Sequence, residues 1–266
     1  MTINVPAWYY AHHGADYSLE HPGQGFGGWT KTEIPIDHEH TAILVMHAWY
    51  QAPYELVPSI WKRVEYIPRA QKIMAEAFPG FLEKVRASGV RLIHIGSRSE
   101  KSLESLPGYQ RVKAAFPPEA PFERIEQDET AKALQEFRRI HVHGDNNPEE
   151  SRINYSTRDF AIRPRDDEDV ACTTGQLFYL CKKYQITHLI YTGFAVNACL
   201  TMSPCGFLDM TRHGLICSIV EDLTTGVENR ESCASEANKA YGLWSFGLWG
   251  GFKFEKADIE NTLLKG

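Results

Sequence analysis

The stretch from His188 to Asp222 constrains the fold more than any other part of this sequence. It opens with an apolar run, residues 188–194, rich in Ile, Leu and aromatic side chains, which is typical of a buried strand. A segment that can be helical follows, over residues 198–213, with Pro204 and Gly206 as possible breaks and Gly214 as its stop signal. Residues 215–220 have the pattern of a second buried strand. The stretch therefore predicts a strand–helix–strand unit.

The same alternation of apolar runs and helical spacing continues along the chain. An apolar run ending at His47 is expected to be the first central strand, because parallel strands that are covered on both faces have this composition. Further strands are predicted at residues 90–95 and 159–162, and helices at residues 70–88 (opened by Pro68 and kinked at Pro79), 129–139 and 174–184. Strands that alternate with helices predict an α/β fold: a doubly wound, mainly parallel sheet with helices on both faces.

Two regions lie outside this alternation. Residues 1–36 are dense in Gly, Pro and aromatic side chains and lack periodicity, so we expect an arm that packs its Trp and Tyr residues onto the domain or a second subunit. Residues 37–266 then form a single domain. Residues 97–150 are rich in proline and charge, and we expect an insert there, either a lid, an oligomerisation element or ordinary surface loops.

Composition excludes several classes of protein. The formal net charge of −6 and the lack of a basic block argue against nucleic acid as a partner. No apolar run reaches membrane-spanning length, and the N-terminus has no signal-peptide pattern. The six cysteines lie in the C-terminal half without CxxC spacing, which favours reduced thiols and a cytoplasmic location. The aromatic N-terminal and C-terminal segments favour a homo-oligomer, a dimer or a tetramer.

Three chemically active residues follow predicted strands: His47, Arg163 and Cys199. Ligands of open parallel sheets bind beyond the carboxyl ends of the strands, so these side chains are expected to share a crevice. Cys199 follows the potential helix N-cap Asn197, where amide N–H groups favour a thiolate. The sulfur would attack a carbonyl carbon, His47 would move protons, and Arg163 would hold the thiolate or an anionic substrate group. The alternative is that Cys199 is a small buried apolar residue.

Other candidates rank lower. Cys205, between Pro204 and Gly206 in a predicted turn, is the second candidate for a reactive thiol. His141 and His143 alternate as on one face of a strand and could bind zinc, but with no third ligand nearby a surface strand is the better interpretation. We therefore predict no metal and no cofactor.

The sequence TGFAVNAC, residues 192–199, resembles the motif of the isochorismatase-like cysteine hydrolases, which include nicotinamidases, N-carbamoylsarcosine amidases and ureidoacrylate amidases. The motif is Gly, two small or apolar residues, Thr, Asn or Asp, any residue and Cys; Val196 stands where the family has threonine. The resemblance extends over most of residues 40–240, through the first apolar strand and the acidic pair Glu221 and Asp222. It does not cover the N-terminal arm or the insert.

The resemblance implies a flavodoxin-like three-layer sandwich and a Cys–Asp–Lys triad. It also implies a cis peptide bond between Phe194 and Ala195, which would aim the N–H groups of Ala195 and Cys199 at one oxyanion. Cys199 takes the nucleophile position. His47 stands where the family has aspartate, and Arg163, with Arg165 as second candidate, stands where it has lysine. Imidazole can exchange a proton with a thiol, whereas guanidinium cannot usefully give one up.

Three hypotheses follow. The first is a hydrolase of a small amide, ureido or related C–N substrate that works through a Cys199 thioester. The second is a catalytically silent family member that binds a ligand or serves as an oligomeric subunit, because the aspartate and the lysine are replaced. The third, hydrolysis of a vinyl ether such as isochorismate, is disfavoured because the family members that do this lack the cysteine.

Overall fold

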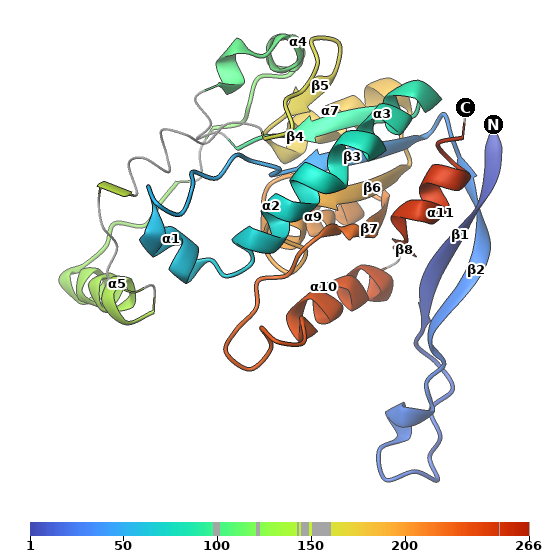
Figure 1. The fold of residues 1–266 in the computed structure, drawn as a ribbon, viewed down its shortest axis with the longest axis horizontal. Coiled ribbons are helices and arrows are strands. Elements are labelled where there is room, and N and C mark those ends of the chain that lie inside the picture. The colour runs from blue at the N-terminus through green and yellow to red at the C-terminus, as the bar shows by residue number, and fades with distance from the viewer. Residues whose placement is uncertain are drawn as a thin grey trace.

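The structure of this chain is a computed structural model that describes residues 1–97, 102–120, 123–142, 144, 149–150, 161–249 and 251–265. In these residues one eight-stranded sheet has the order β2-β1-β8-β7-β6-β3-β4-β5 (Figure 1). Six of its strands are mutually parallel: β3 Thr41–Met46, β4 Arg91–Ile95, β5 Asp169–Ala171, β6 His188–Gly193, β7 Ile216–Thr224 and β8 Lys253–Phe254. The predicted fold class, a doubly wound and mainly parallel α/β sheet, is confirmed.

The strand order places a reversal at the centre of the sheet. Counted along the chain, the parallel strands lie in the order 3-2-1-4-5-6, so the direction of winding changes between β3 and β6. This is the order of dinucleotide-type doubly wound sheets rather than the flavodoxin order 2-1-3-4-5. The three layers that the resemblance implied are present, and the carboxyl ends of β3 and β6 are where such a fold binds ligands.

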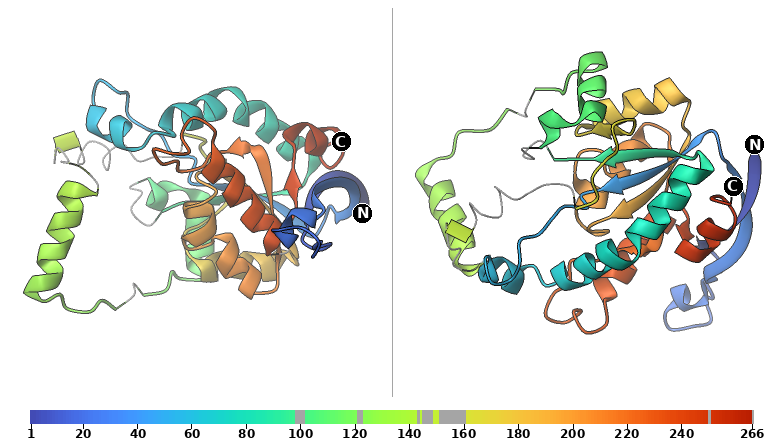
Figure 2. Two further views of the ribbon diagram at one scale, coloured as in Figure 1. Left: turned by 90° about the horizontal axis from the view of Figure 1, so that it is seen from below. Right: turned by 45° about the horizontal axis from the view of Figure 1, so that its top comes forward.

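Helices cover both faces of the sheet because the strand side chains alternate between two apolar clusters. Ile43 and Val45 of β3 pack with α2 (Ile67–Glu76), α3 (Phe78–Ser88) and α11 (Lys256–Asn261). Leu44 and Met46 pack on the other side with α4 (Pro107–Ala115), α7 (Thr174–Tyr184), α8 (Cys199–Met202), α9 (Phe207–Arg212) and α10 (Ala237–Leu248). The short α1 (Pro58–Arg63) and the isolated α5 (Glu129–His141) lie beyond the carboxyl edge of the sheet (Figures 1 and 2).

Residues 1–36 form a β-hairpin that extends the sheet. Strands β1 (Thr2–Ala11) and β2 (Gly28–Asp37) pair antiparallel, and β1 meets β8 at the pair Trp8 and Lys253. The Trp8 indole N–H donates to Glu255 at 2.9 Å, and the Lys253 ammonium lies 5.1 Å from the Trp8 ring centroid. The aromatic residues obscure the strand pattern in the sequence because they also occupy the outward face of the hairpin.

Local differences from the predicted elements have identifiable causes. The break between α2 and α3 falls at Ala77, and Pro79 stands in the first turn of α3, where a missing N–H costs nothing. Gly89, at φ 78°, ends α3 as predicted. The predicted strand at 159–162 lies partly outside the described residues; its described part, Ala161 and Ile162, is a bend, and the strand beside β4 is β5, further along the chain.

The predicted insert contains two different kinds of helix. The first, α4, packs Val112 into the core. The second, α5, is capped by Asp128, whose carboxylate accepts the Ala131 N–H at 2.7 Å, and has no buried residue. Apolar side chains of α5, including Leu134 and Phe137, are exposed. The expected homo-oligomer stays a prediction. Among the described residues, every helix is too short or too polar to cross a membrane.

Candidate active site

The backbones of β3 and β6 come together where the winding direction changes. Met46, the last residue of β3, stands opposite Gly193, the last residue of β6, and the Phe194 N–H donates to the Met46 carbonyl at 3.1 Å. Gly193 has φ 112°, and a Cβ atom there would lie 1.8 Å from the Met46 oxygen. The next residues of the two strands, His47 and Phe194, are therefore held side by side at the carboxyl edge.

His47 leaves β3 in an unusual backbone conformation. Its φ is 53°, its N–H donates to the carbonyl of Ile95 at 3.2 Å, and the residue is 9% exposed. Its ring lies 5.1 Å from the Trp49 ring, between centroids. A left-handed backbone is uncommon for a residue other than glycine, although histidine adopts it more often than most, and such residues are frequent at functional sites. The imidazole is thus nearly enclosed at the edge where the crevice is expected.

The residues after β6 form a tight turn, residues 194–199, which we call the cysteine turn. The peptide bond between Phe194 and Ala195 is cis. The Val196 N–H donates to the Thr225 carbonyl at 2.8 Å, and the Leu200 N–H donates to the Ala195 carbonyl at 3.1 Å. In the described part of the chain, no acceptor is found for the amide N–H of Ala195 or of Cys199. Cys199 is half-buried: it packs against the apolar cluster on the α7 to α10 side of the sheet but is not sealed in the core.

The helical segment expected at 198–213 is interrupted where Pro204 and Gly206 were expected as possible breaks, but the expected cap is wrong. The segment is split into α8, a single turn of four residues, and α9, with Cys205 and Gly206 between them. Asn197 does not cap α8; the residue at the cap position is Ala198, without a side-chain hydrogen bond. Pro204 removes a backbone donor, which explains the break. A helix of one turn has a small dipole, so the dipole effect that a longer helix would have at its first residues is weak here.

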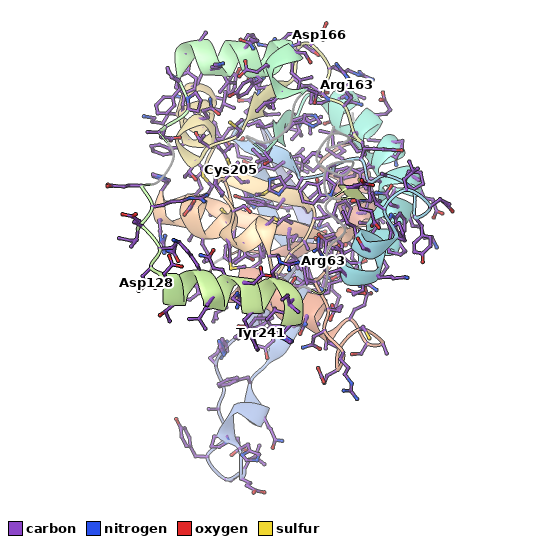
Figure 3. All side chains as sticks on the ribbon, turned by 90° about the vertical axis from the view of Figure 1, so that its left-hand side faces the viewer. Arg63, Asp128, Arg163, Asp166, Cys205 and Tyr241 are labelled. Carbon is purple, nitrogen blue, oxygen red and sulfur yellow. The ribbon has the colours of Figure 1, made fainter. Side chains whose placement is uncertain are left out.

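Arg163 lies close to the end of β3, although not at the end of a strand. The N–H groups of Ala161 and Ile162 both donate to the Ala48 carbonyl, at 2.9 and 3.4 Å. The backbone just before Arg163 therefore adjoins the residue after His47, and the Arg163 side chain is exposed. Arg163 and Cys205 lie well apart in Figure 3, which views the molecule from the side on which α5 lies.

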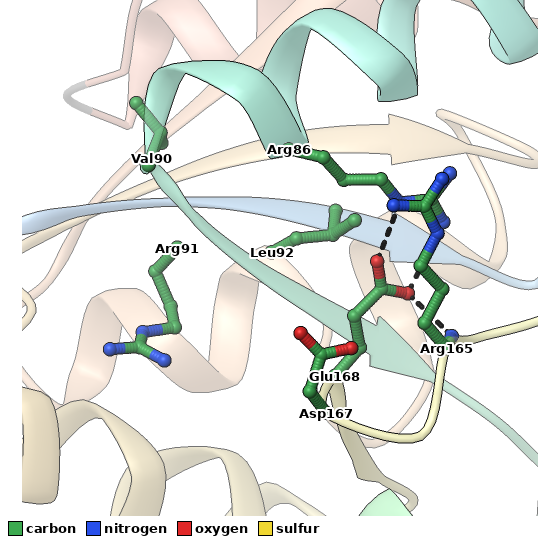
Figure 4. Close-up of a pocket in the computed structure, with 8 residues that line it drawn as sticks. Arg86, Val90, Arg91, Leu92, Arg165, Asp167 and Glu168 are labelled. Carbon is green, nitrogen blue, oxygen red and sulfur yellow. Dashed lines mark hydrogen bonds and ion pairs between the residues drawn. The ribbon is translucent and has the colours of Figure 1, made fainter.

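Arg165 lies at the amino ends of the parallel strands, opposite the carboxyl ends where the candidate site lies. The structure therefore does not bring it to the site. Arg165 lines a pocket of about 260 Å³ together with Gly89 and Arg91, which lie at the start of β4. Its guanidinium pairs with Glu83 at 2.8 and 3.0 Å, and its N–H donates to Glu168 at 2.9 Å (Figure 4). Arg163 and Arg165 are separated by a single residue, and sequence pattern cannot distinguish them because both arginines precede a charged loop.

The Glu168 carboxylate is the centre of a buried ionic network at the pocket that Arg165 lines. Arg86 donates to it at 2.6 Å and His94 at 2.8 Å, and Figure 4 shows Arg86 and Arg165 converging on it. Burial of the carboxyl group opposes its ionisation, but the hydrogen bonds from His94, Arg86 and the Arg165 N–H outweigh it and hold the pKa of Glu168 well below its usual value. Sequence reasoning missed this network because its members come from three distant segments.

Replacing Glu168 by glutamine is expected to lower the free energy of unfolding by about 2 kcal/mol at neutral pH, because a hydrogen-bonded carboxylate is lost. A depressed pKa stabilises the fold above the unfolded value of 4.5, and this contribution is lost as the pH falls below it. The difference in the free energy of unfolding between the parent protein and the glutamine variant should therefore shrink as the pH falls below 4.5. Urea denaturation at several pH values measures it, and a pH-independent difference would contradict the ionised network.

Cys205 is not placed as a nucleophile. It is fully buried, the Tyr191 hydroxyl donates to its carbonyl at 2.8 Å, and burial raises the pKa of its thiol well above the usual value. Burial likewise raises the pKa of Cys181 and of Cys217 to about 12. These thiols pack in the core between the sheet and α7 to α10.

Iodoacetamide is expected to modify only Cys199 and Cys233 in the native protein, because the other thiols are buried. All six should react after unfolding. Peptide mass spectrometry over a time course measures this directly. Modification of Cys205 in the native protein as fast as that of the exposed Cys233 would contradict the structure.

His141 of the insert does not lie in the expected surface strand. His141 is the last residue of α5 and its ring contacts Phe137 at 4.2 Å between centroids, whereas His143 lies outside the described residues. A run of apolar side chains at helical spacing extends through Phe137 and Ile140, and this favours the helix. Within the residues that the structure covers, no three His, Cys, Asp or Glu side chains are grouped as metal ligands.

Comparison with solved structures gives distant likenesses to hydrolases. A cysteine hydrolase from Pseudomonas syringae pv. phaseolicola is 13% identical, with a TM-score of 0.47 and 86% of this chain and 94% of that chain covered. An isochorismatase family protein from Desulfovibrio vulgaris is 11% identical (TM-score 0.44; 84% and 97% covered). An isochorismatase-like hydrolase from Alkaliphilus metalliredigens is 14% identical (TM-score 0.42; 85% and 96% covered).

No protein-family model and no curated protein matches the sequence. Because the identities and TM-scores of the solved structures are this low, these likenesses establish neither a family nor an activity for this chain.

Proposed function

We propose that this chain is a cysteine-dependent hydrolase of a small amide, ureido or related C–N substrate. The observation that carries the proposal is the cysteine turn. It presents a half-buried thiol beside two amide N–H groups, of Ala195 and Cys199, for which the described residues supply no acceptor. The turn lies where the winding of the sheet reverses, next to His47.

The proposed reaction balances without a cofactor. The Cys199 thiol gives its proton to His47 and the sulfur bonds to the carbonyl carbon, while the two N–H groups bind the oxyanion. The C–N bond then breaks, the imidazolium returns the proton to the leaving nitrogen, and a thioester remains on Cys199. Water, deprotonated by His47, hydrolyses the thioester and releases the acid. Arg163, with its exposed guanidinium, would hold an anionic group of the substrate.

The test is to trap the thioester. The protein is incubated with a panel of primary carboxamides and ureido acids, quenched in acid and digested, and the peptide that contains Cys199 is weighed by mass spectrometry. We expect a mass increase equal to the acyl group of one class of substrate, and no increase in a Cys199→Ala variant. Turnover of a substrate without any adduct, and with undiminished rate in that variant, would contradict the proposal.

The second candidate is a catalytically silent protein that binds a ligand or serves as an oligomeric subunit. The observation in its favour is that His47 and Arg163 occupy positions for which the motif's family uses aspartate and lysine. A His47→Asp variant separates the two functions: it should lose activity if His47 is the proton carrier, whereas a gain of amidase activity would favour the silent protein. The cytoplasmic location and the homo-oligomer remain predictions.

A further inference from the structure

The side chain of Asn197 clamps the cysteine turn to another segment of the chain. Its amide oxygen accepts the Val227 N–H at 2.8 Å, and its amide nitrogen donates to the Val227 carbonyl at 2.9 Å. The neighbouring Val196 N–H donates to the Thr225 carbonyl at 2.8 Å. The turn is thus joined to the segment after β7, residues 225–228, by three hydrogen bonds in a row.

That segment is itself fixed to the start of α10. The buried Glu228 carboxylate accepts the N–H groups of Asn238 and Lys239, at 3.0 and 2.9 Å, and the Glu228 N–H donates to Glu65 at 3.1 Å. The Asn238 side chain also donates to the Val227 carbonyl, at 3.2 Å. Asn197 therefore connects the turn to a rigid part of the molecule rather than to a free loop.

Close packing on α10 leaves the turn little room to adjust. A Cβ atom on Gly242 would lie 2.8 Å from Val196 Cγ1 and 3.1 Å from the Asn197 nitrogen, so the helix touches the turn itself. Asn197 stands midway between Ala195 and Cys199. Its half-exposed side chain adds little to the core, but its hydrogen bonds fix the backbone between the two N–H groups.

We propose that Asn197 is a positioning residue: its two hydrogen bonds to Val227 hold the cysteine turn so that the N–H groups of Ala195 and Cys199 meet at one point beside the sulfur. The expected effect of Asn197 on the rate of catalysis rests on the proposed function. Small displacements of reacting groups cost rate steeply, on the order of a hundredfold for about 1 Å. Loosening the clamp should therefore affect rate far more than stability.

Three variants test this. Asn197→Leu removes both hydrogen bonds. Asn197→Asp keeps the acceptor for the Val227 N–H but turns a carboxylate oxygen toward the Val227 carbonyl, where it repels until it is protonated and can donate. Asn238→Ala is the matched control, because it removes a bond to the same carbonyl of Val227 without touching the turn.

Two measurements are made on each variant between about pH 5 and about pH 8, a range in which a carboxyl group facing an acceptor titrates. One is kcat for the amide found by adduct trapping; the other is the rate of Cys199 alkylation by iodoacetamide, which needs no substrate. For Asn197→Leu we expect kcat to fall roughly 10- to 100-fold with KM changed little, and alkylation to slow about fivefold because the loosened turn no longer holds the sulfur in one orientation. Asn238→Ala should stay within about twofold of the parent protein.

The decisive signature is the pH dependence of Asn197→Asp. Its kcat and alkylation rate, each divided by that of the parent protein, should rise as the pH falls and the carboxyl group becomes a donor to Val227. A pH-independent ratio, or an Asn197→Leu variant equal to Asn238→Ala, would overturn the positioning role. If the parent protein turns over no amide while the alkylation pattern holds, the proposed function fails and the positioning role of Asn197 stands.

Discussion

Replacing Cys199 by serine is expected to reduce amide turnover by about four to six orders of magnitude, the effect of removing the nucleophile from a hydrolase that forms a covalent intermediate. A serine hydroxyl is far less acidic than a thiol, so a proton acceptor suited to a thiol would activate it far less. Initial rates with the substrate identified by adduct trapping provide the measurement. The fold should be unaffected because the two side chains have similar size.

A matched control is available in Cys233→Ser, because Cys233 is exposed and lies outside the cysteine turn. This variant should keep full activity. If Cys199→Ser also kept full activity, the thioester mechanism would be excluded and the sulfur would have no part in the reaction.

Replacing Gly193 by alanine is expected to cost at least about 5 kcal/mol of unfolding free energy, at the extreme of single substitutions. The added Cβ would lie 1.8 Å from the Met46 carbonyl oxygen, a backbone atom that pairs β3 with β6, and φ of 112° is unfavourable for alanine. Because the two strands must separate to admit the methyl group, the cysteine turn would move too. Urea denaturation measures the loss, and failure to obtain folded protein agrees with it.

The control for Gly193→Ala is Gly214→Ala. Gly214 has φ 85° but no atom within 4 Å of a Cβ at that position, so only the backbone conformation is penalised. The expected cost is about 1 kcal/mol. Equal losses in the two variants would contradict the close approach of β3 and β6 at Met46.

Sequence pattern predicted the central strands and the fold class because their causes are local. The apolar runs that became β3, β4 and β6 are buried on both faces, and long apolar runs have few other stable uses. The end of α3 was predicted correctly from Gly89, because glycine readily adopts the positive φ at which helices commonly end. The N-terminal hairpin was missed because aromatic residues on both of its faces remove the alternation that indicates a strand. The strand expected at 159–162 was misplaced because β5 is only three residues long and adjoins a charged loop.

For the candidate site, the sequence by itself indicated which residues could carry chemistry: Cys199 after one central strand, His47 after another, and an arginine from the loop that follows the insert. Only the tertiary structure decided where each of them lies. The pairing of β3 with β6 places His47 beside the first residue of the cysteine turn. Arg165 lies instead at the amino ends of the strands, and Cys205 is buried in the core. Asn197, which was expected to cap a helix, instead forms two hydrogen bonds with the backbone of Val227. The physical reason is that residue chemistry and local periodicity depend only on neighbouring residues. Strand order, burial and hydrogen-bond partners depend on contacts between segments far apart in the chain.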